Sequence, residues 1–272
     1  MAESDKAFVG SIPEIYDTYL VPLIFEPYAA DLARRVAALR PQAVLETAAG
    51  TGVVARALAP QLPAGASYTV TDLNQPMLDR AQQHLSWDKR LAWRQADALS
   101  LPFEDGSFDA VCCQFGVMFF PDRVAGHREA LRVLKPGGRL LFNVWDDIAH
   151  NDFARLSNAA AIEIFPDDPP LFLERAPHGY HDEARLRADL ETAGFGDIRF
   201  DTVTHRSEAS SARHAVVGYV QGSPLRSDIE KRNPQLLERV TDRAAELVAQ
   251  QHGTGAVSGR MQAIVVTARK AG

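Results

Sequence analysis

Short apolar runs alternate with amphipathic stretches along the first half of the chain. Runs rich in branched or aromatic residues and bounded by turn residues predict strands over residues 43–48, 67–72, 91–97, 109–116 and 138–145. Between them, apolar residues at helical spacing predict helices over residues 53–62, 76–85 and 123–135. Strands that alternate with helices in this way predict a parallel sheet covered by helices on both faces.

The regular alternation stops after Trp145 and resumes near residue 182. The proline-containing segment between these points is predicted to be a cover over the fold rather than part of its scaffold. Beyond it we expect a helix over 182–195 that ends at Gly194, a strand over 197–206, a helix over 233–253 and a strand over 261–270. The 233–253 helix is expected to begin with Asn233 as its N-cap and to end at Gly253.

A glycine-rich turn, within VLETAAGTGVVARALA at residues 44–59, joins the first predicted strand to the first predicted helix. Gly50 and Gly52 allow a sharp turn and a close approach of the backbone to a ligand, and the helix N-terminus offers N–H groups. The turn also satisfies the G-x-G-x-x-A form of the dinucleotide fingerprint, with Asp72 about 20 residues later. A nicotinamide-dependent oxidoreductase and a plain strand-to-helix turn therefore both remain open at this point.

Acidic residues end three successive predicted strands. Glu46 ends the first strand, before the glycines, where a carboxylate can attract an ammonium group, which dinucleotides lack. Asp72 ends the second strand, where it can accept hydrogen bonds from ribose hydroxyls. Asp97 ends the third strand, where it can accept a hydrogen bond from the exocyclic amine of adenine. A ligand with an ammonium group, a ribose, an adenine and no phosphate fits this trio, and S-adenosylmethionine is such a ligand.

Four ordered blocks of the chain resemble the class I S-adenosylmethionine-dependent methyltransferases, of the group similar to ubiquinone and menaquinone biosynthesis methyltransferases. The blocks are VLETAAGTG, VTDLNQPMLDRA, QADALSLPFEDGSFDAVCCQFGVMFFPD and ALRVLKPGGRLLFNVW, within residues 44–145. The resemblance implies an α/β fold in a single domain, 1–272, with a doubly wound, mostly parallel seven-stranded sheet. This Rossmann-like methyltransferase fold would have an antiparallel last strand and a helical cover. The implied activity is transfer of a methyl group from S-adenosylmethionine to a small-molecule acceptor.

The resemblance also implies which residues hold the cofactor, all of them near the ends of the first four strands. They are Glu46, Ala48, Gly50, Thr51 and Gly52 around the methionine part, Asp72 at the ribose, Leu73 and Met77 beside the ring, Asp97 and Ala98 at the adenine, and Gln114 and Phe115 near the sulfonium. Ala48 stands where the family usually has its first glycine. We expect its methyl group to be tolerated with a negative φ.

Three segments depart from the shared plan of this fold and are expected to form a lid or the substrate side: 1–25, 146–181 and 207–260. The substrate pocket is predicted to use Tyr16, Tyr19, Trp145 and Tyr180. Tyr16 and Tyr19 would share a helical face, where they either close over the sulfonium or pack into the helix.

A dedicated general base is optional, because alignment of the two reactants can supply most of the acceleration. The catalytic residue stays unassigned, and its candidates are Tyr16, Tyr19, His150, His178 and His181. His127, in the predicted helix over 123–135, is expected to face solvent.

Composition and charge narrow the choice of partner and location. With 29 basic and 35 acidic residues the net charge is −6, which disfavours nucleic acid as a partner. The N-terminus lacks a secretory signal pattern and no stretch reaches the ~18 apolar residues of a membrane span, so we expect a cytoplasmic protein. Cys112 and Cys113 are neighbours in an apolar run and are interpreted as core thiols, with no metal site expected.

Two alternatives to methyl transfer stay open. A nicotinamide-dependent oxidoreductase is disfavoured by Glu46 and Asp97, and no tyrosine has a lysine four positions later. The second alternative is a module that binds the cofactor without transferring its methyl group. The sequence fixes neither the acceptor molecule, nor the acceptor atom, nor the oligomeric state, for which a homodimer remains open.

Overall fold

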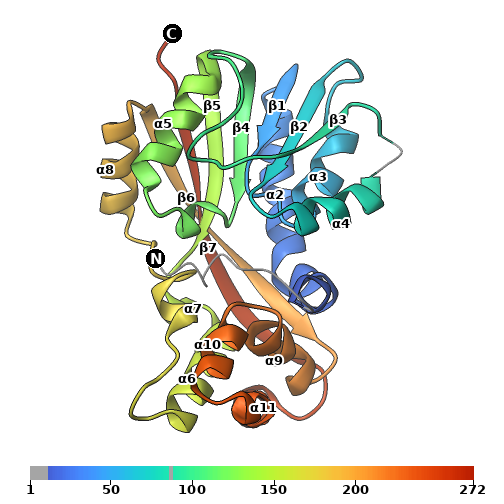
Figure 1. The fold of residues 1–272 in the computed structure, drawn as a ribbon, viewed down its shortest axis with the longest axis vertical. Coiled ribbons are helices and arrows are strands. Elements are labelled where there is room, and N and C mark those ends of the chain that lie inside the picture. The colour runs from blue at the N-terminus through green and yellow to red at the C-terminus, as the bar shows by residue number, and fades with distance from the viewer. Residues whose placement is uncertain (1–11, 86–87) are drawn as a thin grey trace. The chain divides into compact units, whose positions relative to one another are not determined.

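A seven-stranded sheet forms the centre of the fold in the computed structural model, which describes residues 12–85 and 88–272. The strand order is β3-β2-β1-β4-β5-β7-β6, mostly parallel with antiparallel last strands and flanked by helices (Figure 1). The strands are β1 (Ala43–Glu46), β2 (Ser67–Asp72), β3 (Leu91–Gln95), β4 (Phe108–Gln114), β5 (Leu134–Trp145), β6 (Gly196–Ala209) and β7 (Val257–Arg269). The predicted fold class is confirmed.

The parallel pairing brings the carboxyl ends of the first strands to one edge of the sheet. β1 pairs with β2 on one side and with β4 on the other, and Glu46 lies opposite Val70 and Cys112. β2 also pairs with β3, where Asp72 lies opposite Gln95. Doubly wound sheets bind their ligands at the carboxyl ends of their strands. The loops that follow β1 to β4 therefore form the candidate site.

β5 begins earlier than predicted. The sequence places its start at residue 138, after Pro136, whereas the strand begins at Leu134, directly after the preceding helix ends. The pairing with β4 shifts between Leu134 and Arg139, and Gly137 in this interval has a φ of 78°. Pro136 and its glycines therefore form an irregular interval within the strand rather than a separate turn before it.

The helices of the first half of the chain are α1 (Ile12–Ile15), η2 (Tyr16–Phe25), α2 (Glu26–Ala38), α3 (Val53–Leu58), η3 (Ala59–Gln61), α4 (Gln75–Leu85), η4 (Val117–Phe119) and α5 (Arg123–Val133). Those of the second half are η5 (Ile148–His150), α6 (Asp152–Ile164), α7 (Phe172–Arg175), α8 (Glu183–Ala193), α9 (Ala212–Gln221), α10 (Leu225–Arg232), η6 (Pro234–Leu236) and α11 (Leu237–His252). The predicted end of α8 at Gly194 and the predicted cap of η6 by Asn233 are both present, since Gly194 is left-handed and the Asn233 side chain accepts from the Gln235 N–H.

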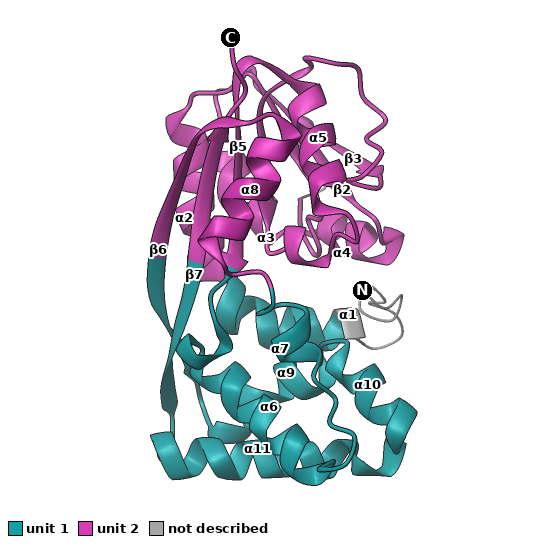
Figure 2. Ribbon diagram, turned by 90° about the vertical axis from the view of Figure 1, so that its left-hand side faces the viewer, with its two compact units in different colours: residues 1–25, 145–179, 203–263 teal, residues 26–144, 180–202, 264–272 magenta. Residues whose placement is uncertain are grey.

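The chain divides into two compact units, coloured separately in Figure 2. Unit 2 comprises residues 26–144, 180–202 and 264–272, and it contains β1 to β4, most of β5 and the helices α2 to α5 and α8. Its core is built from the apolar faces of the central strands, with Val44, Leu45 and Val70 fully buried.

Unit 1 comprises residues 1–25, 145–179 and 203–263. It is mainly helical, and α11 packs against α9 and α6 through buried residues that include Val240, Ala244 and Val248. The segments predicted as a lid or substrate side, 1–25, 146–181 and 207–260, fall almost entirely within this unit. Residues 1–11 of the first segment lie outside the described residues.

Candidate functional site

The glycine turn after β1 is tied to the end of β2 by hydrogen bonds. The Gly50 N–H donates to Oδ2 of Asp72 at 2.8 Å, and the Ala49 N–H donates to the Thr71 carbonyl at 3.0 Å. Gly50 and Gly52 have φ values of 56° and 79°, which L-residues with side chains adopt at a cost. The two predicted glycines therefore shape the turn, and Asp72 holds it against the neighbouring strand.

Gly52 has a second reason to lack a side chain. A Cβ placed on it would come within 2.9 Å of the Ala81 Cβ in α4. The glycine thus lets the N-terminus of α3 approach α4 closely, in addition to allowing the left-handed backbone.

The expectation of a negative φ at Ala48 is wrong. Its φ is 53°, in the left-handed region where the Cβ crowds the backbone. Space for the methyl group comes from Gly116, because a Cβ on that glycine would collide with the Ala48 Cβ. The alanine therefore keeps the backbone conformation of a glycine, and Gly116 makes room for it.

Glu46 is a buried carboxyl group behind the glycine turn. Its side chain is 1% exposed, and the Tyr68 hydroxyl donates a hydrogen bond to Oε2. Burial raises the pKa of Glu46 to about 8, against the opposing effect of the Tyr68 hydrogen bond. The carboxyl group of the ligand-free protein is thus largely protonated at neutral pH, and a nearby cation would favour its ionised form.

Asp72 is also buried and uses both carboxylate oxygens. Oδ1 accepts from the Asn74 N–H at 2.8 Å, while Oδ2 accepts from Gly50. Burial raises the pKa of Asp72, and these backbone hydrogen bonds lower it in part. Oδ1 also accepts from Nδ2 of Asn74 at 3.4 Å, so Oδ2 is the oxygen with more capacity to accept from a ligand.

Leu73 and Met77, the two residues predicted to contact the ring, follow Asp72 in the chain. Leu73 is 43% exposed, which is unusual for a large apolar side chain in this fold, and Met77 is buried one turn into α4. An exposed leucine next to a buried carboxylate is a suitable apolar surface for a heterocycle attached to a ribose.

Asp97 lies two residues beyond the end of β3 and is exposed. Its Oδ1 accepts from the Leu99 N–H at 2.9 Å, and its carbonyl accepts from the Ser100 N–H at 3.0 Å. The carboxylate thus caps a tight turn that includes Ala98, and its other oxygen is available for a ligand donor. The sequence placed Asp97 in the strand, and the structure places it in the loop that follows.

A strained turn follows β4 at the predicted sulfonium side. Phe115 has a φ of 52°, and its N–H donates to Oδ1 of Asn143 at 3.0 Å and to the Asn143 carbonyl at 3.1 Å. The Tyr28 ring lies edge-on to Phe115, with the ring centroids 5.4 Å apart, and Gln114 is buried. Sequence reasoning missed Asn143, whose only signal was a polar residue inside the apolar run of β5.

The residues of this edge fit S-adenosylmethionine. A buried hydroxyl, Oγ1 of Thr51, lies between the two glycines and has no hydrogen-bond partner among the described residues. A buried polar group without a partner is costly, and a polar ligand would satisfy it. Together with the buried Glu46 and Asp72 and the exposed Leu73, it supplies partners for a charged amino-acid part, a ribose and an apolar ring.

Among the predicted substrate residues, Tyr16 and Trp145 belong to one aromatic cluster in unit 1. The ring centroids of Tyr16 and Phe25 are 5.1 Å apart, those of Phe25 and Trp145 are 6.1 Å apart, and those of Trp145 and His178 are 6.0 Å apart. We call these four residues the aromatic cluster. Nδ1 of His178 lies 2.8 Å from the Asp146 carbonyl, which can only accept, so the neutral ring carries its proton on Nδ1.

The remaining substrate and catalytic candidates lie elsewhere. Tyr19 contacts His214 of α9, with the ring centroids 5.2 Å apart, so its neighbour differs from that of Tyr16. Both tyrosines belong to the π-helical segment η2, whose wider turn changes which residues share a face. His150 ends the short helix η5, and His181 follows Tyr180 in unit 2.

Tyr180 is buried in unit 2 rather than placed in the aromatic cluster. Its hydroxyl donates to Oδ2 of Asp189 at 2.7 Å, and the Arg123 guanidinium lies 4.2 Å from its ring centroid. These contacts join the start of α5 to α8, so they give Tyr180 a packing role.

The expectation that His127 faces solvent is wrong. The side chain is 1% exposed, and its ring lies 5.4 Å from the Phe142 ring of β5. Burial lowers the pKa of His127 to about 4. The contact with Phe142 places the His127 ring on the side of α5 that packs against β5.

None of the helices among the described residues has the length and apolar character needed to cross a membrane. No group of three or more histidine, cysteine or acidic side chains in the part of the chain that the structure describes is arranged to hold a metal ion.

Comparison with known proteins identifies the family. Residues 45–142 match the model of a methyltransferase domain. The chain is 31% identical over 205 residues to a demethylmenaquinone methyltransferase of Clavibacter sepedonicus, covering 67% of this chain and 79% of that protein.

Two solved structures share the fold. A protein of Bacillus halodurans C-125, proposed to be a methyltransferase, is 23% identical with a TM-score of 0.57, and the match covers 90% of this chain and 99% of that one. A phosphoethanolamine N-methyltransferase of Haemonchus contortus, solved with S-adenosylhomocysteine, is 19% identical with a TM-score of 0.51, covering 85% of this chain and 49% of that one. S-adenosylmethionine is the cofactor, and the chain belongs to the class I S-adenosylmethionine-dependent methyltransferases.

Proposed function

We propose that the methyl acceptor is a small planar ring compound of the phenol or hydroquinone type. The observation that carries this proposal is the 31% identity to a demethylmenaquinone methyltransferase over 79% of that protein. The aromatic cluster of Tyr16, Phe25, Trp145 and His178 supports it, because offset or edge-on aromatic contacts stabilise a flat ring.

S-adenosylmethionine supplies an electrophilic methyl carbon on its sulfonium. We assign Glu46 to the ammonium group of the cofactor, Asp72 to the ribose hydroxyls and Asp97 to the adenine amine. Leu73 and Met77 would flank the ring, and the Gly50 to Gly52 turn would pass close to the methionine part. These residues fix the position of the methyl group, and such alignment is the main contribution a protein makes to a direct displacement.

The residue that takes the proton lost by a phenol or hydroquinone acceptor stays unassigned among Tyr16, Tyr19, His150, His178 and His181. A general base contributes a factor of about 10² to 10⁴ when it is in reach of the proton.

The test is a transfer assay with methyl-labelled S-adenosylmethionine and three acceptor sets, namely hydroquinones, simple phenols and amines. We expect label in the hydroquinone or phenol products. Label in the amines alone would overturn the proposed acceptor class. Cofactor binding without transfer to any set would favour the module that binds without catalysis.

A cytoplasmic location is also proposed. Fractionation of cells that express the full chain tests it, and recovery in the membrane or secreted fraction would contradict it.

A further inference from the structure

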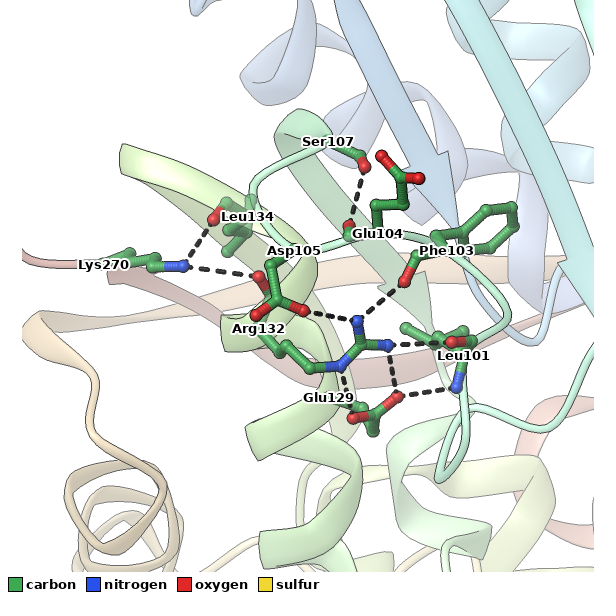
Figure 3. Close-up of polar contacts among 9 residues, drawn as sticks. All are labelled: Leu101, Phe103, Glu104, Asp105, Ser107, Glu129, Arg132, Leu134 and Lys270. Carbon is green, nitrogen blue, oxygen red and sulfur yellow. Dashed lines mark hydrogen bonds and ion pairs between the residues drawn. The ribbon is translucent and has the colours of Figure 1, made fainter.

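The loop between β3 and β4 is held to α5 by one arginine side chain. Figure 3 shows the Arg132 guanidinium between the loop and Glu129. Nη1 donates to the Phe103 carbonyl at 2.7 Å and to Oδ1 of Asp105 at 2.8 Å, and Nη2 donates to the Leu101 carbonyl at 2.8 Å. We call this set of contacts, together with Glu129, the Arg132 clamp.

Glu129 completes the clamp from the same helix. Its two oxygens accept from Nε and Nη2 of Arg132, each at 2.8 Å, and Oε2 also accepts from the Leu101 N–H at 2.7 Å. Hydrogen bonds from Arg132 lower the pKa of Glu129, so the pair is ionised at neutral pH. Leu101 is therefore held through both its N–H and its carbonyl, one by each member of the ion pair (Figure 3).

Backbone groups reinforce the same attachment. The Gly106 N–H donates to the Arg132 carbonyl at 3.0 Å, so the far end of the loop is bound to the same residue. Nζ of Lys270, after β7, donates to the Leu134 carbonyl at 2.6 Å and to the Arg132 carbonyl at 3.4 Å. A lysine at the carbonyls of a helix C-terminus stabilises that end, so the last turn of α5 is a firm base for the clamp.

The clamp acts on the loop that carries Asp97. The turn from Asp97 to Ser100 is closed by its own hydrogen bonds, and Leu101 follows it immediately. Fixing Leu101 therefore fixes the end of this turn and with it the direction of the Asp97 carboxylate. Asp97 itself is exposed. On the other side of the turn the Ala96 N–H donates to the Asp72 carbonyl at 3.0 Å, so the turn is attached at both ends and the clamp supplies the attachment after Asp97.

We infer that Arg132 is a positioning residue for adenine recognition, which it achieves by holding the 97–106 loop in its binding-competent arrangement. This inference rests on the proposed role of Asp97. Charge-assisted and bidentate contacts make the clamp stronger than a neutral turn. When a loop is competent for only about a tenth of the time, the apparent Kd rises about tenfold, which sets the expected effect of losing the clamp.

The experiment measures the Kd of S-adenosylhomocysteine and the amide exchange of the ligand-free protein for Arg132→Gln and for Arg128→Gln. Arg128 lies on the same helix and is exposed, and it donates to the Thr192 carbonyl at 3.4 Å rather than to the loop, so it is the matched control. We expect Arg132→Gln to raise Kd about tenfold and to speed exchange at Leu101 and Gly106, with less than about a twofold change in Kd for Arg128→Gln. If Arg132→Gln does not fold, Arg132→Lys takes its place. Lysine keeps the charge but cannot bridge both carbonyls and the carboxylate, so its Kd should rise more than that of Arg128→Gln.

A double variant with Asp97 distinguishes positioning of Asp97 from a general structural role of Arg132. In an Asp97→Asn background, the added Arg132→Gln change should alter Kd by less than about twofold, because the Asp97 carboxylate that the clamp positions is then already absent. An unchanged Kd for Arg132→Gln, or the same tenfold loss in both backgrounds, would overturn the inference while leaving the proposed function intact. Absence of any S-adenosylhomocysteine binding by the wild-type protein would instead overturn the proposed function and the inference with it.

Discussion

Replacing Glu46 by glutamine is expected to change how the stability of the ligand-free protein depends on pH. The pKa of Glu46 is about 8 in the folded protein and 4.5 as its ordinary value. Between these values the folded carboxyl group keeps a proton that the unfolded chain loses, so the free energy of unfolding falls as the pH rises from about 4.5 to about 8. At ~1.4 kcal/mol for each pH unit, the fall approaches ~4 to 5 kcal/mol by pH 8.

Glutamine has no proton to lose, and its amide oxygen can still accept from Tyr68. Urea unfolding of wild type and Glu46→Gln at pH 5, 6, 7 and 8 should therefore show curves that diverge as the pH rises, with the variant more stable at pH 8. Glu191→Gln, an exposed carboxyl on α8, is the control and should follow wild type. Parallel pH dependence of wild type and Glu46→Gln would refute the buried, protonated carboxyl group.

The same carboxyl group links ligand binding to proton release. If Glu46 faces the ammonium group, binding of S-adenosylhomocysteine at pH 7 should release about 0.9 proton from it, because a carboxyl of pKa about 8 is about 90% protonated there. Calorimetry in phosphate and in Tris buffer measures the released proton from the difference in binding enthalpy. Equal proton release by wild type and Glu46→Gln would place the ammonium group elsewhere.

Three further changes test particular features of the fold. Wild type should lose stability as the pH falls from about 6.5 towards 4, because unfolding lets His127 bind a proton. Urea unfolding of His127→Phe at acid pH should lack this loss, and the same pH dependence in both proteins would refute the buried neutral histidine. Ala48→Gly should raise the free energy of unfolding by ~0.5 to 1 kcal/mol by removing left-handed strain, and a lower value would show that the methyl contact with Gly116 matters more. Gly52→Ala should cost ~2 kcal/mol or more, since the new Cβ meets Ala81 and the φ is 79°; chemical denaturation that finds less than ~0.5 kcal/mol would refute this.

The strands and the three acids were predictable because their signals are local. Each strand of the central sheet is a short apolar run next to turn residues, and each acid is fixed by its distance from the end of its own strand. Parallel pairing then places Glu46 and Asp72 at one edge without further information. The ends of several strands differed from the predicted ranges, and the earlier end of β3 moved Asp97 into the loop.

Features that depend on distant segments were not predictable from one sequence. The burial of His127 depends on its contact with Phe142 of β5, and the tolerance of Ala48 depends on Gly116, which lies far along the chain. Arg132 and Leu101 are 31 residues apart, and nothing in the local pattern indicates that they meet. The helices of unit 1 within segments 146–181 and 207–260 were mostly missed, because short buried helices have apolar residues on several faces.

The most direct test of the central claim is calorimetric titration of S-adenosylhomocysteine and, separately, of NAD into wild type, Asp72→Asn and Asp79→Asn. Asparagine at position 72 removes the charge and can still accept from the Gly50 N–H through its amide oxygen, while its amide nitrogen replaces the oxygen that accepts from the Asn74 N–H. Asp79, an exposed residue of α4, is the matched control. The account predicts that wild type and Asp79→Asn bind S-adenosylhomocysteine alike, that Asp72→Asn binds it ~2 kcal/mol more weakly, and that none of them binds NAD. Binding of NAD with no response to S-adenosylhomocysteine, or equal affinity of wild type and Asp72→Asn, would contradict it.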